Sequence, residues 1–151
     1  AAGAIEAVVA ALQAHPQVAG VQRQGCAALS NVYSGIDAAR LAHRQRAADA
    51  GAIEAAVAAM QAHSQEAGVQ KQGCAALANV CCGDDAAGLA RSQRAADAGA
   101  IEAAVAALQA HPQVAGVQER GCRALGNVFL GDDAAGFARR QRAADAGAIE
   151  A

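Results

Sequence analysis

The sequence is poor in large aromatic side chains: its 151 residues include no tryptophan, one tyrosine and two phenylalanines. Hydrophobic residues still make up 54% of the chain, and most of them are alanine. Because alanine buries little area, the apolar stabilisation of about 25 cal/mol per Å² depends on sparse Ile, Val and Leu. Alanine is also the best helix former, and no segment has the pattern of a strand. We therefore expect an all-α fold.

The net charge is also low, and long apolar runs are absent. A net charge of −2 gives no general attraction to nucleic acid or to an anionic membrane. No apolar run reaches the roughly 18 residues of a membrane helix, and no signal-peptide pattern is present. We expect neither a nucleic-acid nor a membrane partner. The first residue is Ala rather than Met, which favours an excised or engineered piece of a longer chain.

Motifs for chemistry are missing as well. The sequence has no CxxC pair, no Ser or Cys nucleophile with a placed base, and no P-loop, so we expect no enzyme, no catalytic residue and no cofactor. The histidines His15, His63 and His111 recur at the end of one helix. Stacked repeats would hold them too far apart for one metal ion to lie about 2 Å from each, and we expect no metal site.

Five cysteines are present, of which Cys26, Cys74 and Cys122 occupy one position in a repeated pattern. Helices pack about 8–10 Å apart, whereas a disulfide needs Cα atoms about 4.4–6.8 Å apart. These three thiols are therefore expected to be unpaired core residues. Such usage favours a reducing compartment, the cytoplasm or the nucleus.

What the chain does have is a period of 48 residues: segment 25–32 returns as 73–80 and as 121–128. We predict one domain, 1–151, of three units with no linker between them. The units are 3–50, 51–98 and 99–146, and 147–151 opens a fourth. A unit of this size cannot bury its apolar residues alone, but stacked units can.

Each unit is predicted to hold three helices, which in the first unit cover 4–15, 17–33 and 37–50. Apolar residues recur at helical spacing in the first helix, and Pro16 ends it; the second unit has Ser64 there, so the turn does not depend on proline. An acid such as Asp37 caps the third helix. The expected anchors of the third helices are Leu41, Leu89 and Phe137.

The order of motifs resembles the armadillo repeat. Ala50-Gly51-Ala52-Ile53 precedes an apolar helix, Gly-Val-Gln follows, and the unit closes on Ala-Leu-x-Asn-Val. The resemblance covers essentially the whole chain, although the usual repeat has about 42 residues. It implies a right-handed α-solenoid of the armadillo/HEAT-like superfamily, acting as a non-catalytic scaffold for protein–protein interaction.

In armadillo proteins the motif asparagine lines a concave groove and hydrogen-bonds the main chain of an extended peptide. A carboxamide suits this role because it offers one acceptor and two donors. Four residues earlier, import receptors of the family carry Trp, which is absent here, and this argues against basic import signals. Mixed to mildly basic side chains nearby favour an acidic partner. The predicted groove residues are Asn31, Asn79, Asn127, Ala27, Ala75, Arg123, Gln24, Gln72, Arg120, Arg23, Lys71 and Glu119.

Two alternatives remain open. In the first, the asparagines only satisfy backbone groups near helix ends, and the charged residues form a solvated face. In the second, the chain is a structural or engineered array with no specific ligand. Residues 2–7 and 146–151 both read AGAIEA, so the two ends match the two sides of one joint. Such a contact does not close on itself, and we expect head-to-tail self-association.

Overall fold

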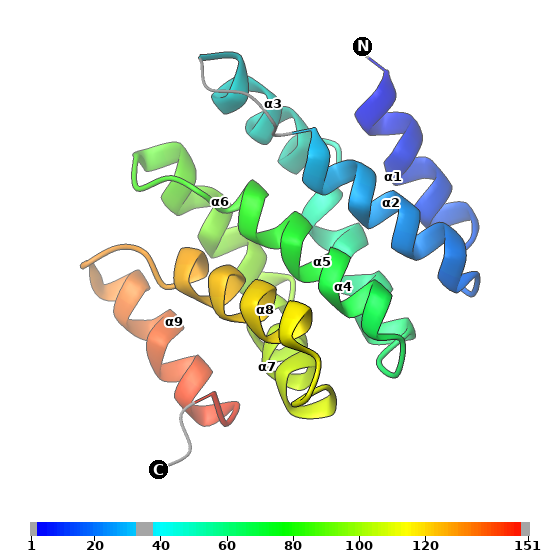
Figure 1. Cartoon of the computed structure of the whole chain (residues 1–151). Coiled ribbons are helices and arrows are strands. Elements are labelled where there is room, and N and C mark those ends of the chain that lie inside the picture. The colour runs from blue at the N-terminus through cyan, green and yellow to red at the C-terminus, as the bar shows by residue number, and fades with distance from the viewer. Residues whose placement is uncertain (1–2, 33–37, 149–151) are drawn as a thin grey trace.

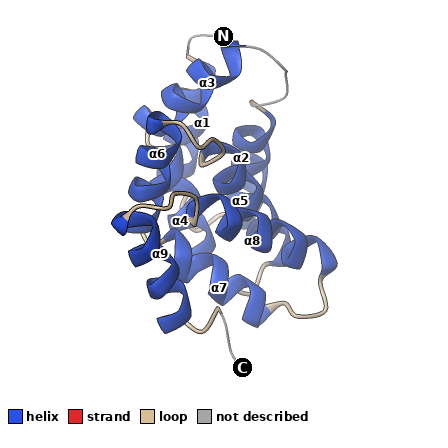
Figure 2. Ribbon diagram, turned by 90° about the vertical axis from the view of Figure 1, so that its left-hand side faces the viewer, coloured by secondary structure: helices blue, strands red, loops and turns tan. Residues whose placement is uncertain are grey.

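The computed structural model describes residues 3–32 and 38–148, and within these ranges the chain is all-α, with nine helices and no strand (Figures 1 and 2). The prediction of an all-α fold is confirmed. The helices are α1 (Ala4–Ala14), α2 (Ala19–Asn31), α3 (Ala38–Asp49), α4 (Ala52–Ala62), α5 (Ala67–Val80), α6 (Ala86–Asp97), α7 (Ala100–Ala110), α8 (Ala115–Val128) and α9 (Ala134–Asp145). The predicted cap Asp37 lies outside the described residues.

The helices form three rows, each made of helices that begin 48 residues apart (Figures 1 and 2). The second row, α2, α5 and α8, is packed most extensively: α5 lies between α2 and α8 and contacts both. In the first row α4 lies against both α1 and α7, and in the third row α6 contacts α3 and α9. Each predicted unit thus contributes one helix to each row.

The core follows the predicted helical stripes. Ile53 and Leu77 are almost fully buried, and alanines such as Ala56 fill the narrow space between helices. Glycine brings the first and second helices of a unit together: a Cβ at Gly73 would lie 2.4 Å from Met60 Cγ. The chain compensates for its small side chains by close helix approach.

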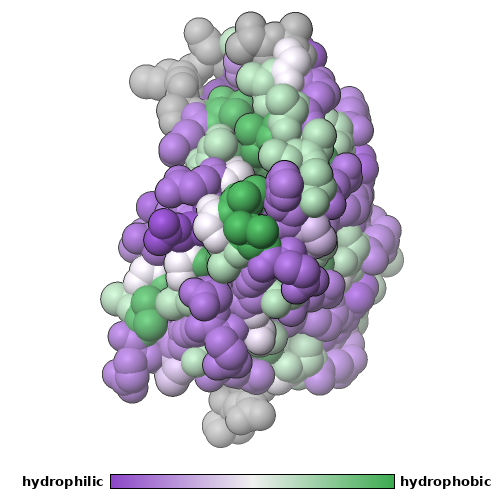
Figure 3. Space-filling view, turned by 90° about the vertical axis from the view of Figure 1, so that its right-hand side faces the viewer, coloured by the Kyte–Doolittle hydropathy of each residue, from purple (hydrophilic) through white to green (hydrophobic). Residues whose placement is uncertain are grey.

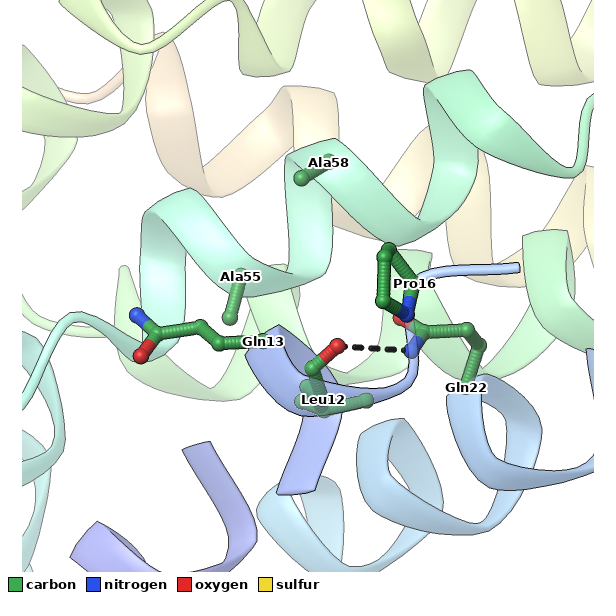
Figure 4. A pocket seen from close by; sticks show the side chains of 6 residues that line it. All are labelled: Leu12, Gln13, Pro16, Gln22, Ala55 and Ala58. Atoms are coloured by element: carbon green, nitrogen blue, oxygen red, sulfur yellow. Dashed lines mark hydrogen bonds between the residues drawn. The ribbon is translucent and has the colours of Figure 1, made fainter. Parts of the chain in front are cut away.

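Each turn between the first and second helices is held by a glutamine, which is buried in the first two units and half-buried in the third. Gln22 Nε2 donates to Leu12 O at 2.9 Å and to His15 O at 2.8 Å, beside Pro16 (Figure 4). Gln70 and Gln118 make the same pair of bonds in the later units. These carbonyls lie at a helix C-terminus and lack intrahelical partners. The turn forms equally at Ser64, so its independence of proline is confirmed.

The predicted anchors of the third helices are wrong in two units. Phe137 is 66% exposed and Leu41 is 48% exposed. In α6 the buried face consists of Gly88, Arg91, Ser92, Ala95 and Ala96. Leu89 therefore lies at the edge of the buried face of α6, and alanines pack where a large side chain was expected.

Buried arginines attach the third helices instead. Arg91, which is only 3% exposed, donates from Nε to Val80 O at 2.8 Å, from Nη2 to Cys82 O at 3.2 Å and from Nη1 to Gln45 Oε1 at 3.1 Å. Its positive charge lies at the C-terminus of α5, where the helix dipole is negative. Arg139 makes the corresponding bonds one unit later.

Other arginines of the third helices form ion pairs with the first helices. Arg46 pairs with Glu6 at 2.9 Å and Arg94 pairs with Glu54 at 2.6 Å. Each pair joins the third helix of a unit to the first helix of the same unit.

Candidate functional site

A polar hollow of about 390 Å³ lies on the second row of helices. Its lining comes from α2, α5 and α8, which lie side by side (Figure 1). The lining residues are Ala27, Ser30, Asn31, Lys71, Gln72, Ala75, Asn79 and Arg120. All of them except Ser30 are predicted groove residues, so residues from three units come together in one hollow.

The remaining predicted residues do not line this hollow. Arg23 lies at a separate hollow of about 280 Å³ beside Glu66. Gln24 lies at an apolar hollow on α1 and α2. Arg123 and Glu119 are exposed on α8. Asn127, also on α8, is half-buried and bonded to the preceding unit.

The hollow carries uncompensated positive charge. Lys71 is exposed, Arg120 is half-buried, and no carboxylate lines the hollow. Within residues 3–32 and 38–148 neither cation makes an ion pair. The Lys71 side chain lies against α8, because a Cβ at Gly116 would be 3.0 Å from Lys71 Cδ and 3.4 Å from its Nζ. The ammonium group is therefore kept beside the hollow.

The motif asparagines have bonds between units. Asn79 Nδ2 donates to Ser30 O at 2.8 Å, and Asn127 Nδ2 donates to Ala78 O at 2.6 Å. Both acceptors lie in the last turn of the neighbouring helix, where carbonyls lack intrahelical partners. One N–H and the Oδ1 of each carboxamide remain available. Asn31 is exposed, and its side chain makes no hydrogen bond to the described part of the chain.

Ser30 is the lining residue that sequence reasoning missed. Its Oγ donates to Ala27 O at 2.8 Å, and its carbonyl accepts the bond from Asn79. Ser30 lies three positions after Ala27, on the same side of α2. That spacing was a usable signal, but the later units have Ala78 and Gly126 at this position, which removes it from the repeated pattern.

The recurring histidines connect the turns of adjacent units. His63 Nε2 donates to Pro16 O at 2.8 Å, and His111 Nε2 donates to Ser64 O at 2.8 Å. Each histidine follows the last residue of its helix, as predicted. Among the described residues no group of three or more His, Cys, Asp or Glu is placed to hold a metal ion.

The thiols fall into two kinds, and all five are free. Burial raises the pKa of Cys26, Cys74 and Cys81 to about 12, so these thiols stay protonated and unreactive. Cys122 was predicted in the core at the same repeat position, and that prediction is wrong: it is exposed. No described helix packs on its side of α8 as α5 packs on α2.

No family model, curated protein or solved structure matches this chain. In the described residues, no helix combines the length and the apolar character needed to cross a membrane. The function is therefore inferred from the geometry of the chain itself.

Proposed function

We propose that the chain is a right-handed α-solenoid of three 48-residue armadillo-like units, and that it binds an extended acidic peptide or protein segment along α2, α5 and α8. It acts as a non-catalytic interaction scaffold. The partner is a protein segment rather than nucleic acid or a membrane surface.

Contacts between units support the stacked arrangement. The bonds Asn79–Ser30, His63–Pro16 and Arg91–Gln45 each join residues 46–49 positions apart. Each is repeated one unit later with its equivalent residues. Bonds that recur with the sequence period are typical of proteins in which each repeat contacts its neighbours.

The observation that carries the binding proposal is the polar hollow. It crosses three helices. It presents the carboxamide of Asn31, together with the Oδ1 and the remaining N–H of Asn79, about one unit apart along the row. An extended main chain alternates N–H and C=O groups, which a carboxamide can bond without reading the side chain. Asn79 thus has two roles, because its other N–H group joins the second unit to the first.

The charge of the hollow favours acidic side chains in the partner. Lys71 and Arg120 approach the hollow from α5 and α8 without a lining carboxylate. An aspartate or glutamate of a bound segment would supply that charge, and hydrogen bonds to charged groups contribute about 1.5–3 kcal/mol. Alanine at positions 27 and 75 leaves no aromatic surface on which a basic side chain would stack.

The test is a fluorescence-anisotropy screen of extended peptides that differ only in carrying Asp/Glu, Lys/Arg or neutral residues. We expect selection of acidic members and weaker binding at high salt. Lys71→Gln with Arg120→Gln should weaken binding at least about tenfold. Asn31→Ala should weaken it roughly 2–10-fold without loss of a bond inside the protein.

Arg94→Gln is the matched control, because it removes the same charge from α6, which does not line the hollow. It should change affinity far less than Arg120→Gln. Selection of no acidic peptide over its neutral counterpart, or equal losses from the two arginine substitutions, would refute the proposal.

A further inference from the structure

We propose that two copies of the chain 1–151 join head to tail, with α1 and α2 of one copy packing against α7, α8 and α9 of another. The contact repeats the joints between the units inside each chain except at Gly3 and Ala4, because Gly147 and Ala148 of the other copy hold the corresponding positions. The occupant of the α1–α2 face is a second copy of the chain. Asn31, which also lines the polar hollow on the second row, takes part in this contact.

The α1–α2 face carries an apolar hollow of about 400 Å³. Val8, Ala11, Val21 and Ala28 line it. Figure 3 shows hydrophobic surface gathered in the upper part of one side, where α1 and α2 lie in Figure 1. The equivalent residues one unit later, Ala56, Ala59, Val69 and Ala76, are at most 2% exposed. Two units later they are again buried, as Ala104, Ala107, Val117 and Ala124.

The opposite face has the complementary property. Cys122 and Gly126 are exposed on α8, whereas their equivalents Cys74 and Ala78 are fully buried against the following unit. Leu108 is half-buried, although its equivalent Met60 is 2% exposed. Positions that are buried at the joints between units are thus partly exposed at the two ends of the chain. The positions exposed at one end are those that pack, at the inner joints, against the positions exposed at the other end.

Polar groups extend the same match. Asn79 donates to Ser30 O and Asn127 donates to Ala78 O. The next member of this series is Asn31 of a second copy donating to Gly126 O. Asn31 is exposed without a bond in the described chain, and the Gly126 carbonyl lies in the last turn of α8. The histidine series continues in the same way, from His15 of the second copy to Pro112 O.

The joint between copies is weaker than the joints within one. Arg91 donates to Gln45 and Arg139 donates to Gln93, but a docked copy brings His43 to Gln141. The α8 surface also carries Arg123 where the inner joint has Ala75. Association is therefore concentration-dependent. Because a head-to-tail contact does not close on itself, it continues beyond the dimer.

Sedimentation velocity and light scattering of the chain 1–151, in reductant and from micromolar to millimolar concentration, test the proposal. We expect mass that grows past the dimer, and a fall in the reactivity of Cys122 toward a thiol reagent as the chain associates. Val21→Glu buries a charge in the joint and should raise the dissociation constant about tenfold or more. Arg123→Ala, which restores the residue of the inner joint, should lower it.

Ala14→Glu is the matched control. Ala14 is exposed at the end of α1, and its equivalents Ala62 and Ala110 are also exposed. It should associate like the unchanged chain, and circular dichroism should give equal helix content for all variants. A monomer at every concentration, growth that stops at a closed dimer, or equal effects of Ala14→Glu and Val21→Glu would overturn the proposal.

Discussion

The first and second units have nearly the same sequence but different surroundings. Val8 is half-buried while its equivalent Ala56 is fully buried, and Asn31 is exposed while Asn79 is bonded to the neighbouring unit. The second unit also has a buried Arg91 where the first has an exposed His43. The comparison teaches that in this fold the role of a residue is set by the unit beside it as much as by its own helix.

The largest effect should come from the central leucine. Leu29, Leu77 and Leu125 are 0%, 1% and 6% exposed. Truncation to alanine should cost about 2–5 kcal/mol for a buried site, with Leu77→Ala costing most because α5 has a neighbour on both sides. Urea unfolding of the three variants measures this. A larger loss at Leu125 than at Leu77 would contradict the order.

Arg91→His gives the second unit the residue of the first. The substitution leaves Val80 O without the guanidinium that bonds it and leaves Cys82 O with only the 3.5 Å bond from Arg44 Nη1. A buried acceptor left unsatisfied costs about 1–3 kcal/mol. Thermal unfolding should show the loss. The converse change, His43→Arg, adds a donor and removes no hydrogen bond in the described chain. It should therefore not destabilise the chain.

Gly88→Arg gives the second unit the arginine that the first unit has at the equivalent position, Arg40. A Cβ at Gly88 would lie 2.3 Å from Gly83 O, a backbone atom that cannot move aside. Overpacking of this kind costs about 1–3 kcal/mol. Gly126→Ala is the control: nothing lies within 4 Å of its Cβ, and replacing a helical glycine there should stabilise the chain by about 0.5–1 kcal/mol. Chemical denaturation distinguishes the two outcomes by sign.

A smaller effect is expected from the asparagines. Asn79→Ala removes the bond to Ser30 O and should cost about 1 kcal/mol of unfolding free energy. Asn31→Ala removes no bond in the described chain and should leave stability unchanged. Equal losses in parallel urea titrations, run at concentrations where the chain is monomeric, would show that Asn31 has an internal role.

The smallest effect near neutral pH, and a growing one in alkali, comes from the buried thiols. Cys26, Cys74 and Cys81 have a pKa near 12 in the folded chain against an ordinary value of 9.0. Above pH 9 the unfolded chain loses these protons while the folded chain keeps them, so stability falls as pH rises from 9 towards 12. Urea midpoints at pH 8 and pH 10 measure the fall, which should shrink when the three cysteines are replaced by alanine.

Much of the fold follows from the sequence because the period fixes the order of elements. Proline and the Ser64 turn, the glycines after the third helices, and the Ile–Val–Leu stripe all give local signals, and Gly51 and Gly99 have the positive φ values of 86° and 91° expected of breaks. The hollow was also largely predictable, since Asn31, Asn79 and their neighbours recur with the period.

What the sequence did not show was decided by contacts across units. Phe137 looks like a core residue by type, yet the buried face of its helix is filled by glycine, arginine and alanine. Arg91 and Gln22 look like surface residues, yet each is buried because its polar atoms meet helix-end carbonyls. Cys122 has the same local sequence as Cys74, and only the absence of a described helix on its outer side exposes it.

The glutamine at each turn has a consequence for the order of folding. Gln22 bonds carbonyls only 7 and 10 positions away, whereas the bonds between units span 46–49 positions. Short loops close with a smaller entropic cost than long ones, and chains rich in local contacts fold fast. Each pair such as α1 and α2 can therefore form as a helical hairpin before the bonds between units close.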